Sequence, residues 1–152
     1  MTATVTRLAM MATATAAAAI ALSVTAQAAS DNTFQSPSGN IECWMYNTDA
    51  GVSNAGCDIG EHAYTPAIPG PGGPAPRACN AVIRFHLGGN DPSGLGCQDL
   101  TDLHAPGLAT VAYGRSRTLG TITCDSEPSG ITCNDHSTGR FFRVSRDSYQ
   151  IG

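Results

Sequence analysis

Six cysteines constrain the fold of this chain more than any other feature of its sequence. They are Cys43, Cys57, Cys79, Cys97, Cys124 and Cys133. None belongs to a C-x-x-C pair, so their spacing indicates neither a zinc site nor a thioredoxin-like redox centre. An even number of cysteines in an exported chain is typical of a disulfide-linked domain, here with three bridges.

The N-terminal segment indicates export. Arg7 is the only charged residue before an apolar, alanine-rich run from Leu8 to about Val24, and Ala26-Gln27-Ala28 follows as a small-x-small cleavage pattern. These features predict a secretory signal peptide over residues 1–28, cleaved after Ala28 or, alternatively, after Ala29. We therefore expect residues 29–152 to form a single domain that is secreted or held in the cell envelope.

The charge balance bears on the class of partner. All eight basic residues are arginine, and without Arg7 seven of them stand against twelve acidic residues, a net charge of −5. An acidic chain without a basic run argues against nucleic acid as a partner. No segment after the signal is long and apolar enough to span a bilayer, so we expect no membrane contact after cleavage.

Pro-Ser-Gly occurs three times, each time shortly before a cysteine. Proline at the second position and glycine at the fourth fit a type I β-turn, so each copy predicts a turn: 36–39, 91–94 and 127–130. Pairing Glu127 with Gly130 in antiparallel register places Cys124 opposite Cys133, roughly 4.5–5.5 Å apart at Cα, which a disulfide can bridge. A bulge at the turn would shift this register by one residue.

This local geometry favours one disulfide pairing. Sequence alone permits fifteen pairings of six cysteines. The sequential pairing Cys43–Cys57, Cys79–Cys97 and Cys124–Cys133 closes three short loops, each worth roughly 3 kcal/mol of stability in the chain-entropy model. An aliphatic residue two positions before Cys43, Cys97, Cys124 and Cys133 shares their strand face, which predicts disulfides among core side chains.

Short alternating segments separated by turn residues predict the fold class. We expect strands at 41–46, 56–59, 79–87, 110–113, 118–124, 131–134 and 141–145, with Ile83, Phe85 and Leu87 on one face of the third. One helical turn is expected over 99–105. The prediction is an all-β or β-rich small domain, with antiparallel hairpins linked by three disulfides and little helix.

Residues 64–78 are rich in proline and glycine (YTPAIPGPGGPAPRA), which excludes a helix or an inner strand. We expect an extended surface loop of low complexity. A tolerated insertion is the favoured interpretation. The alternative is a polyproline-like ligand or a rigid arm.

Three segments carry a resemblance. FQSPSGNIECWM, CDIGEHAY and GITCNDHSTGRFFRVSRDSYQI resemble an uncharacterised family of small secreted actinobacterial proteins over about residues 33–151. Where many members have Gly-His-Gly, this chain has Gly139-Arg140 followed by Phe141. The resemblance implies export and a disulfide-linked domain, and it implies no activity, cofactor or catalytic residue.

Catalytic motifs are not found in the sequence. There is no G-x-S-x-G elbow, H-E-x-x-H helix, P-loop or dinucleotide fingerprint, so we predict no catalytic residue, cofactor or metal ligand. His62, His86, His104 and His136 lack ligand spacing, and His86 is expected to face outward. Residues 134–139 (NDHSTG) could touch a metal ion, but a plain polar turn is favoured.

Trp44 and Tyr46 are the candidate ligand contacts. Alternation places both on the strand face opposite Cys43, where exposed rings can stack on sugars or anchor a protein. The competing interpretation is that another layer of the protein covers them. The favoured function is a non-catalytic extracellular or cell-wall module that binds glycan or a protein. The alternatives are a small secreted hydrolase using His104 with Asp102, and a protease inhibitor that presents the loop before Cys79.

Overall fold

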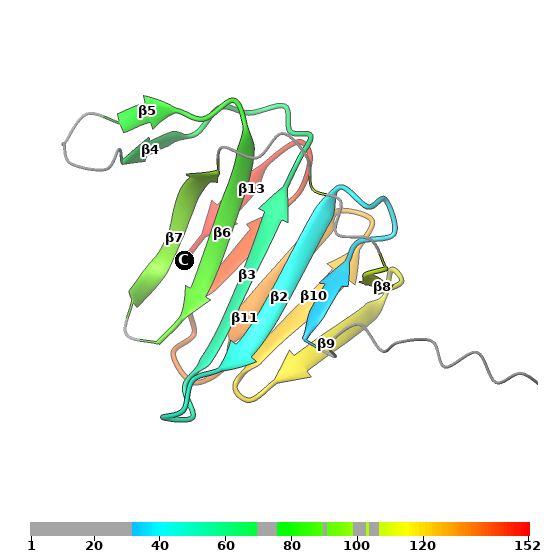
Figure 1. Cartoon of the computed structure of the whole chain (residues 1–152), viewed down its shortest axis with the longest axis vertical. Coiled ribbons are helices and arrows are strands. Elements are labelled where there is room, and N and C mark those ends of the chain that lie inside the picture. The colour runs from blue at the N-terminus through cyan, green and yellow to red at the C-terminus, as the bar shows by residue number, and fades with distance from the viewer. Residues whose placement is uncertain (1–31, 70–75, 90, 99–102, 104–106) are drawn as a thin grey trace, which may run out of the picture.

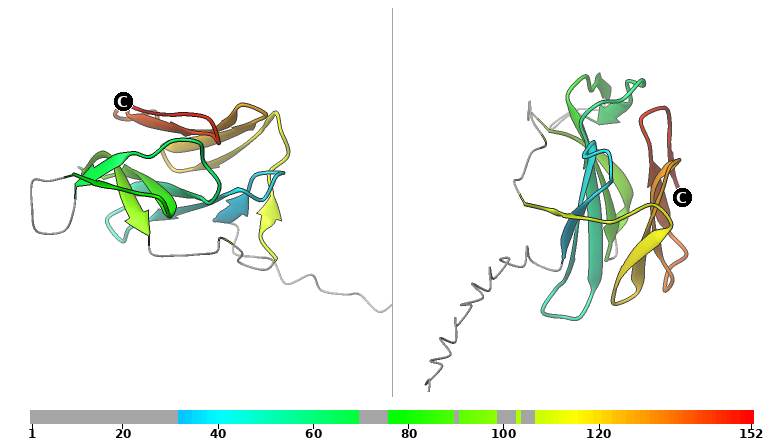
Figure 2. Two further views of the ribbon diagram at one scale, coloured as in Figure 1. Left: turned by 90° about the horizontal axis from the view of Figure 1, so that it is seen from above. Right: turned by 90° about the vertical axis from the view of Figure 1, so that its right-hand side faces the viewer.

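Two β-sheets stacked face to face make up most of the described chain (Figure 1, Figure 2). The structure is a computed structural model, and it describes residues 32–69, 76–89, 91–98, 103 and 107–152. The predicted signal peptide, residues 1–28, lies outside these residues. So does the predicted helical turn at 99–105, apart from Leu103.

The first sheet has six strands in the order β7-β6-β3-β2-β1-β8, and the second has five in the order β13-β12-β11-β10-β9. Neighbouring strands are antiparallel, except that β1 and β8 pair in parallel. The predicted β-rich class with antiparallel hairpins is confirmed. The strands of the six-stranded sheet are β1 (Thr33–Gln35), β2 (Ile41–Asn47), β3 (Ser53–Ile59), β6 (Val82–Gly88), β7 (Asp91–Gln98) and β8 (Ala109–Thr110). Those of the five-stranded sheet are β9 (Arg115–Leu119), β10 (Ile122–Glu127), β11 (Gly130–Asp135), β12 (Phe141–Val144) and β13 (Tyr149–Ile151).

The core lies between the two sheets. Ile83, Phe85 and Leu87 on β6 are buried together, as the alternation predicts. Phe85 meets Phe142 of the opposite sheet with ring centroids 5.8 Å apart. Burying one such side chain stabilises a fold by about 1.5–3 kcal/mol, so the alternating inner faces hold the two layers together.

The three predicted disulfides are present in the sequential pairing. Cys43 lies opposite Cys57 across β2 and β3, and Cys124 lies opposite Cys133 across β10 and β11, each pair with a Cα–Cα distance of 4.0 Å. Cys79 reaches Cys97 from the segment before β6, at 5.7 Å. Three disulfides indicate folding in an oxidising compartment.

Two of the three Pro-Ser-Gly copies form turns. Gly39 N donates to Ser36 O, and Glu127 pairs with Gly130 without a register shift. The third copy is not a turn, because Asp91–Gln98 is strand β7 and Gly88 pairs with Asp91. The preceding Gly-Gly-Asn is a stronger hairpin signal than Pro-Ser-Gly, so the chain reverses earlier. Pro92 is tolerated because β7 is an edge strand next to a bulge.

Other strand predictions need correction. The single strand expected at 118–124 is two strands, because Leu119 pairs with Ile122 around Gly120, which has a positive φ. Glycine at the first position of a two-residue hairpin loop is the signature of a type II′ turn. The strand expected at 110–113 is shorter and ends at Thr110, and β1 around Phe34 was not predicted.

The proline-rich segment is not a plain loop. Its ends pair as a two-stranded ladder of β4 (Ala67–Pro69) and β5 (Pro76–Ala78), at one corner of the sandwich (Figure 1). We call residues 64–69 and 76–78 the arm. The exclusion of this segment from the inner strands holds, because the arm belongs to neither main sheet.

Candidate ligand-binding face

The outer face of the six-stranded sheet brings together the two predicted ligand contacts. Cys43 is buried, and Trp44 and Tyr46 alternate to the opposite face of β2, as predicted. Tyr46 is 48% exposed, whereas Trp44 is half-buried. The reason for this difference is the row of residues that lies beside Trp44.

That row alternates large rings with glycine. Trp44 on β2 lies opposite Gly56 on β3, which lies opposite His86 on β6, which lies opposite Gly94 on β7. A Cβ added to Gly56 would overlap the Trp44 ring, and one added to Gly94 would overlap the His86 ring. Each ring therefore covers the glycine of the neighbouring strand. His86 is exposed, as predicted.

Charged side chains form the next row. Arg84 donates to both carboxylate oxygens of Asp58, from Nε at 2.8 Å and from a terminal nitrogen at 2.7 Å. These hydrogen bonds raise the pKa of the Arg84 guanidinium above its ordinary value, so Arg84 stays charged at neutral pH. The guanidinium carbon also lies 4.6 Å from the centroid of the Trp44 ring, a cation–π distance. Glu42 occupies the same row, directly opposite Asp58.

The sequence did not reveal that Arg84, Asp58 and His86 join Trp44 on this face. Alternation alone places His86 on the outside of its strand. The contact of Arg84 on β6 with Trp44 on β2 depends on the register of β3, which lies between these two strands, and no short-range pattern of residues predicts that register. The outer face of the five-stranded sheet differs in chemistry. Its two central rows read Ser116, Asp125, Thr132, Arg143 and Gln150, and Thr118, Thr123, Asn134 and Phe141.

Two of the Pro-Ser-Gly turns meet at one end of the sandwich. The turns at 36–39 and 127–130 line a groove of about 990 Å³, together with Arg143, Arg146 and Tyr113. Asn40 and Glu61 form one side of this groove. The Asn40 side chain accepts a hydrogen bond from Glu61 N at 2.7 Å and donates one to Glu61 O at 2.8 Å, which holds the two segments together. Charges of both signs line the groove, and nothing in the linear sequence signalled that these turns converge.

The histidines do not form a catalytic cluster in the described part of the chain. The His62 ring lies between two carbonyl oxygens, with Nδ1 2.6 Å from Tyr64 O and Nε2 3.0 Å from Ala81 O. His136 lies 3.2 Å from the Thr123 hydroxyl. The predicted Asp102 and His104 pair lies outside the described residues. Among those described, no group of three or more histidine, cysteine, aspartate or glutamate side chains could hold a metal ion.

Residues 134–139 form a polar turn, as the sequence predicts. The Asp135 carboxylate accepts from Ser137 N at 3.0 Å, from the Ser137 hydroxyl at 2.7 Å and from the Thr138 hydroxyl at 2.9 Å. Burial alone would raise the pKa of Asp135, but these bonds and one from Thr121 outweigh it and lower the pKa to about 2. The carboxylate is therefore a structural acceptor that organises its own loop.

Comparison with known proteins adds no relative. No protein-family model matches the chain, and searches of curated proteins and of solved structures find no match either. Within the described residues, no helix has the length and hydropathy needed to cross a bilayer.

Proposed function

We propose that this protein is a non-catalytic extracellular module that binds a cell-wall glycan through the outer face of its six-stranded sheet. The observation that carries the proposal is the gathering of Trp44, Tyr46 and His86 on this face, where Trp44 and His86 pack over glycines. Rings held against a sheet offer an apolar platform of low conformational freedom.

The charged row supplies the polar half of such a site. Sugar hydroxyls accept hydrogen bonds, and the buried Asp58 carboxylate holds the Arg84 guanidinium in a fixed orientation beside Trp44. Arg84 is about one-third exposed, so it remains accessible to a ligand. An apolar ring flanked by a few oriented polar groups is the usual composition of a small-molecule site.

Export supports the same proposal. The predicted signal peptide and the three disulfides both fit a protein that works outside the cytoplasm. The hydrolase and inhibitor alternatives depend on Asp102, His104 and the tip of the proline-rich segment, which lie outside the described residues.

A sedimentation assay on insoluble cell wall tests the proposal. Tyr46→Ala removes an exposed ring without opening the core, and we expect binding at least about ten-fold weaker, as for a ring that contributes at least about 1.4 kcal/mol. Tyr113→Ala is the matched control, because Tyr113 is 45% exposed but lies at the groove. We expect this variant to bind like the wild type.

Trp44→Ala should also lose binding. Because this substitution uncovers Gly56, the melting temperature of the variant must be measured as well, to separate lost binding from lost stability. The proposal fails if the wild type does not sediment with cell wall. It also fails if Tyr113→Ala loses binding while Tyr46→Ala keeps it, which would move the site to the groove.

A further inference from the structure

One of the three disulfides differs from the others in its exposure. Cys43, Cys57, Cys124 and Cys133 are 0–2% exposed, between the sheets. Cys79 is also buried, but its partner Cys97 is exposed. An attacking thiolate must reach a disulfide sulfur directly, so accessibility separates this bridge from the other two.

The position of the bridge in the fold differs as well. Cys97 lies on β7, the edge strand of the six-stranded sheet, opposite Ile83. Cys79 follows the arm directly, and its N–H donates to Pro66 O at 3.2 Å. The bridge therefore joins an edge strand to the base of the arm, whereas each of the other two joins paired strands within a sheet.

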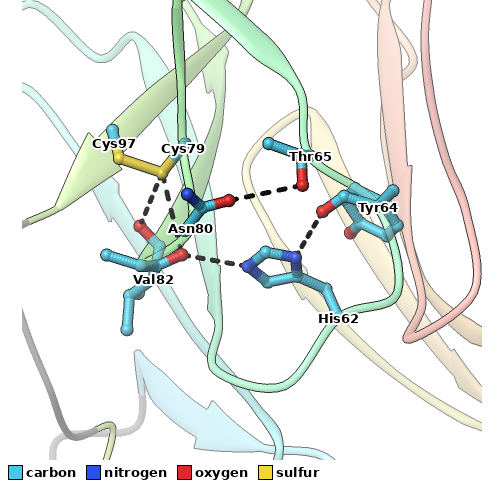
Figure 3. The surroundings of a disulfide bond; sticks show 8 residues. His62, Tyr64, Thr65, Cys79, Asn80, Val82 and Cys97 are labelled. Carbon is cyan, nitrogen blue, oxygen red and sulfur yellow. Dashed lines mark hydrogen bonds between the residues drawn. A yellow bond between two sulfur atoms is a disulfide. The ribbon is translucent and has the colours of Figure 1, made fainter.

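Hydrogen bonds hold the residues next to Cys79 in place independently of the bridge (Figure 3). His62 Nε2 lies 3.0 Å from Ala81 O, two residues after Cys79. The Thr65 hydroxyl donates to Asn80 Oδ1 at 3.4 Å. These contacts join the segment around Cys79 to residues 62–66, and they do not depend on the sulfur–sulfur bond.

We propose that the Cys79–Cys97 bridge is a site of reversible thiol–disulfide exchange with a dithiol reductant, and that it opens while the other two bridges stay closed. A thiolate of the reductant attacks the Cys97 sulfur and forms a mixed disulfide, and the Cys79 thiolate leaves and takes up a proton. The second thiol of the reductant then closes its own disulfide and releases Cys97, which is also protonated. Two electrons pass to the protein, and the reductant leaves as a cyclic disulfide.

Opening the bridge removes the covalent link between the base of the arm and the edge strand. β7 carries Pro92 and a bulge, and it pairs with β6 alone among the described strands, so it depends on the bridge more than an inner strand would. Both inter-strand bridges remain buried in the sandwich. The core therefore keeps its packing while this corner loosens.

The test is native-state reduction followed by alkylation. The oxidised protein, without denaturant, is exposed to dithiothreitol for increasing times, quenched with iodoacetamide and mapped by peptide mass spectrometry. We expect labels at Cys79 and Cys97 at least about ten-fold faster than at the other four cysteines, with an unchanged circular dichroism spectrum. Replacing the reductant with oxidised glutathione, which takes up the two electrons, should restore the same bridge.

The double variant Cys79→Ser with Cys97→Ser is the control. Its four remaining cysteines should stay unlabelled under the same conditions, because their bridges are buried independently of this one. The proposal is overturned if all six cysteines are labelled together or if another bridge opens first. Resistance of Cys79 and Cys97 at dithiothreitol concentrations that reduce the urea-unfolded chain would also overturn it.

Discussion

At the scale of single residues, the glycines of the outer face decide how its rings lie. Gly56 and Gly94 have no side chain, and the rings of Trp44 and His86 occupy the space above them. Covering a strand glycine with a ring from the next strand recovers packing that the glycine lacks. The same packing that orients Trp44 therefore also stabilises the sheet.

Gly56→Ala and Gly94→Ala form a matched pair that tests this packing. The new methyl of Gly56→Ala must displace the half-buried Trp44, and we expect a loss of about 1–3 kcal/mol in the free energy of unfolding. Gly94→Ala meets only the exposed His86 ring, which can turn away, so we expect a change within about 0.5 kcal/mol. Urea unfolding followed by the fluorescence of Trp44, the single tryptophan, measures both. Equal losses in the two variants would contradict this account.

Asp135 links the stability of its loop to pH. Its pKa is about 2 in the folded protein and about 3.9 in an unfolded chain. A lowered pKa contributes stability that is fully present above about pH 4 and is lost as the pH falls through about 2. We expect Asp135→Asn to be less stable than the wild type at pH 7, by on the order of 2 kcal/mol, and the gap to narrow towards pH 2. Unfolding free energies at several pH values measure this, and a gap independent of pH would refute it.

At the scale of elements, the two Pro-Ser-Gly turns share three residues but differ in backbone conformation. Gly39 has φ +71° and nothing closer than 3.9 Å to an added Cβ. Gly130 has φ +123°, and an added Cβ would overlap the carbonyl of Val144 on β12. The first turn connects β1 and β2 and leaves space around Gly39. The second turn connects β10 and β11 and packs against β12.

This contrast predicts different tolerance at the two glycines. Gly39→Asn should cost at most about 1 kcal/mol, because asparagine tolerates the left-handed region. Gly130→Asn should cost more than about 3 kcal/mol, because both its φ and a backbone oxygen exclude a side chain. Thermal unfolding of the two variants compares them directly. A Gly130→Asn protein as stable as Gly39→Asn would show that the β11–β12 contact is looser than described.

The elements also explain which predictions failed. Alternation in Thr118 to Cys124 continues through Gly120, so the pattern reads as one strand although the chain reverses there. The copy at 91–94 has the residues of a turn, but Gly88 and Gly89 just before it reverse the chain more readily. A periodic pattern identifies strand residues well and locates the reversal between two strands poorly.

At the scale of the whole molecule, the packing of two sheets and three disulfides both stabilise the fold. Two bridges lie inside the sandwich and reinforce ladders that already pair, whereas the third joins the edge of one sheet to the arm. The two outer faces carry different chemistry, with aromatic rings gathered on the six-stranded sheet. The molecule thus presents one candidate ligand face and one reducible corner on the same sheet.

The sequence by itself determined the β-rich class, the turn at 127–130 and the outward placement of Trp44, Tyr46 and His86, and among fifteen disulfide pairings it favoured the one that the structure has. These follow from short-range physics: strand periodicity, turn stereochemistry and the closure of short loops. The tertiary structure alone decided that Trp44 covers Gly56 beside Arg84, that two distant turns share a groove, and that Cys97 is exposed while the other five half-cystines are buried. Each of these depends on the register between strands from separate parts of the chain and on which strand ends at an edge, and no local pattern of residues encodes either.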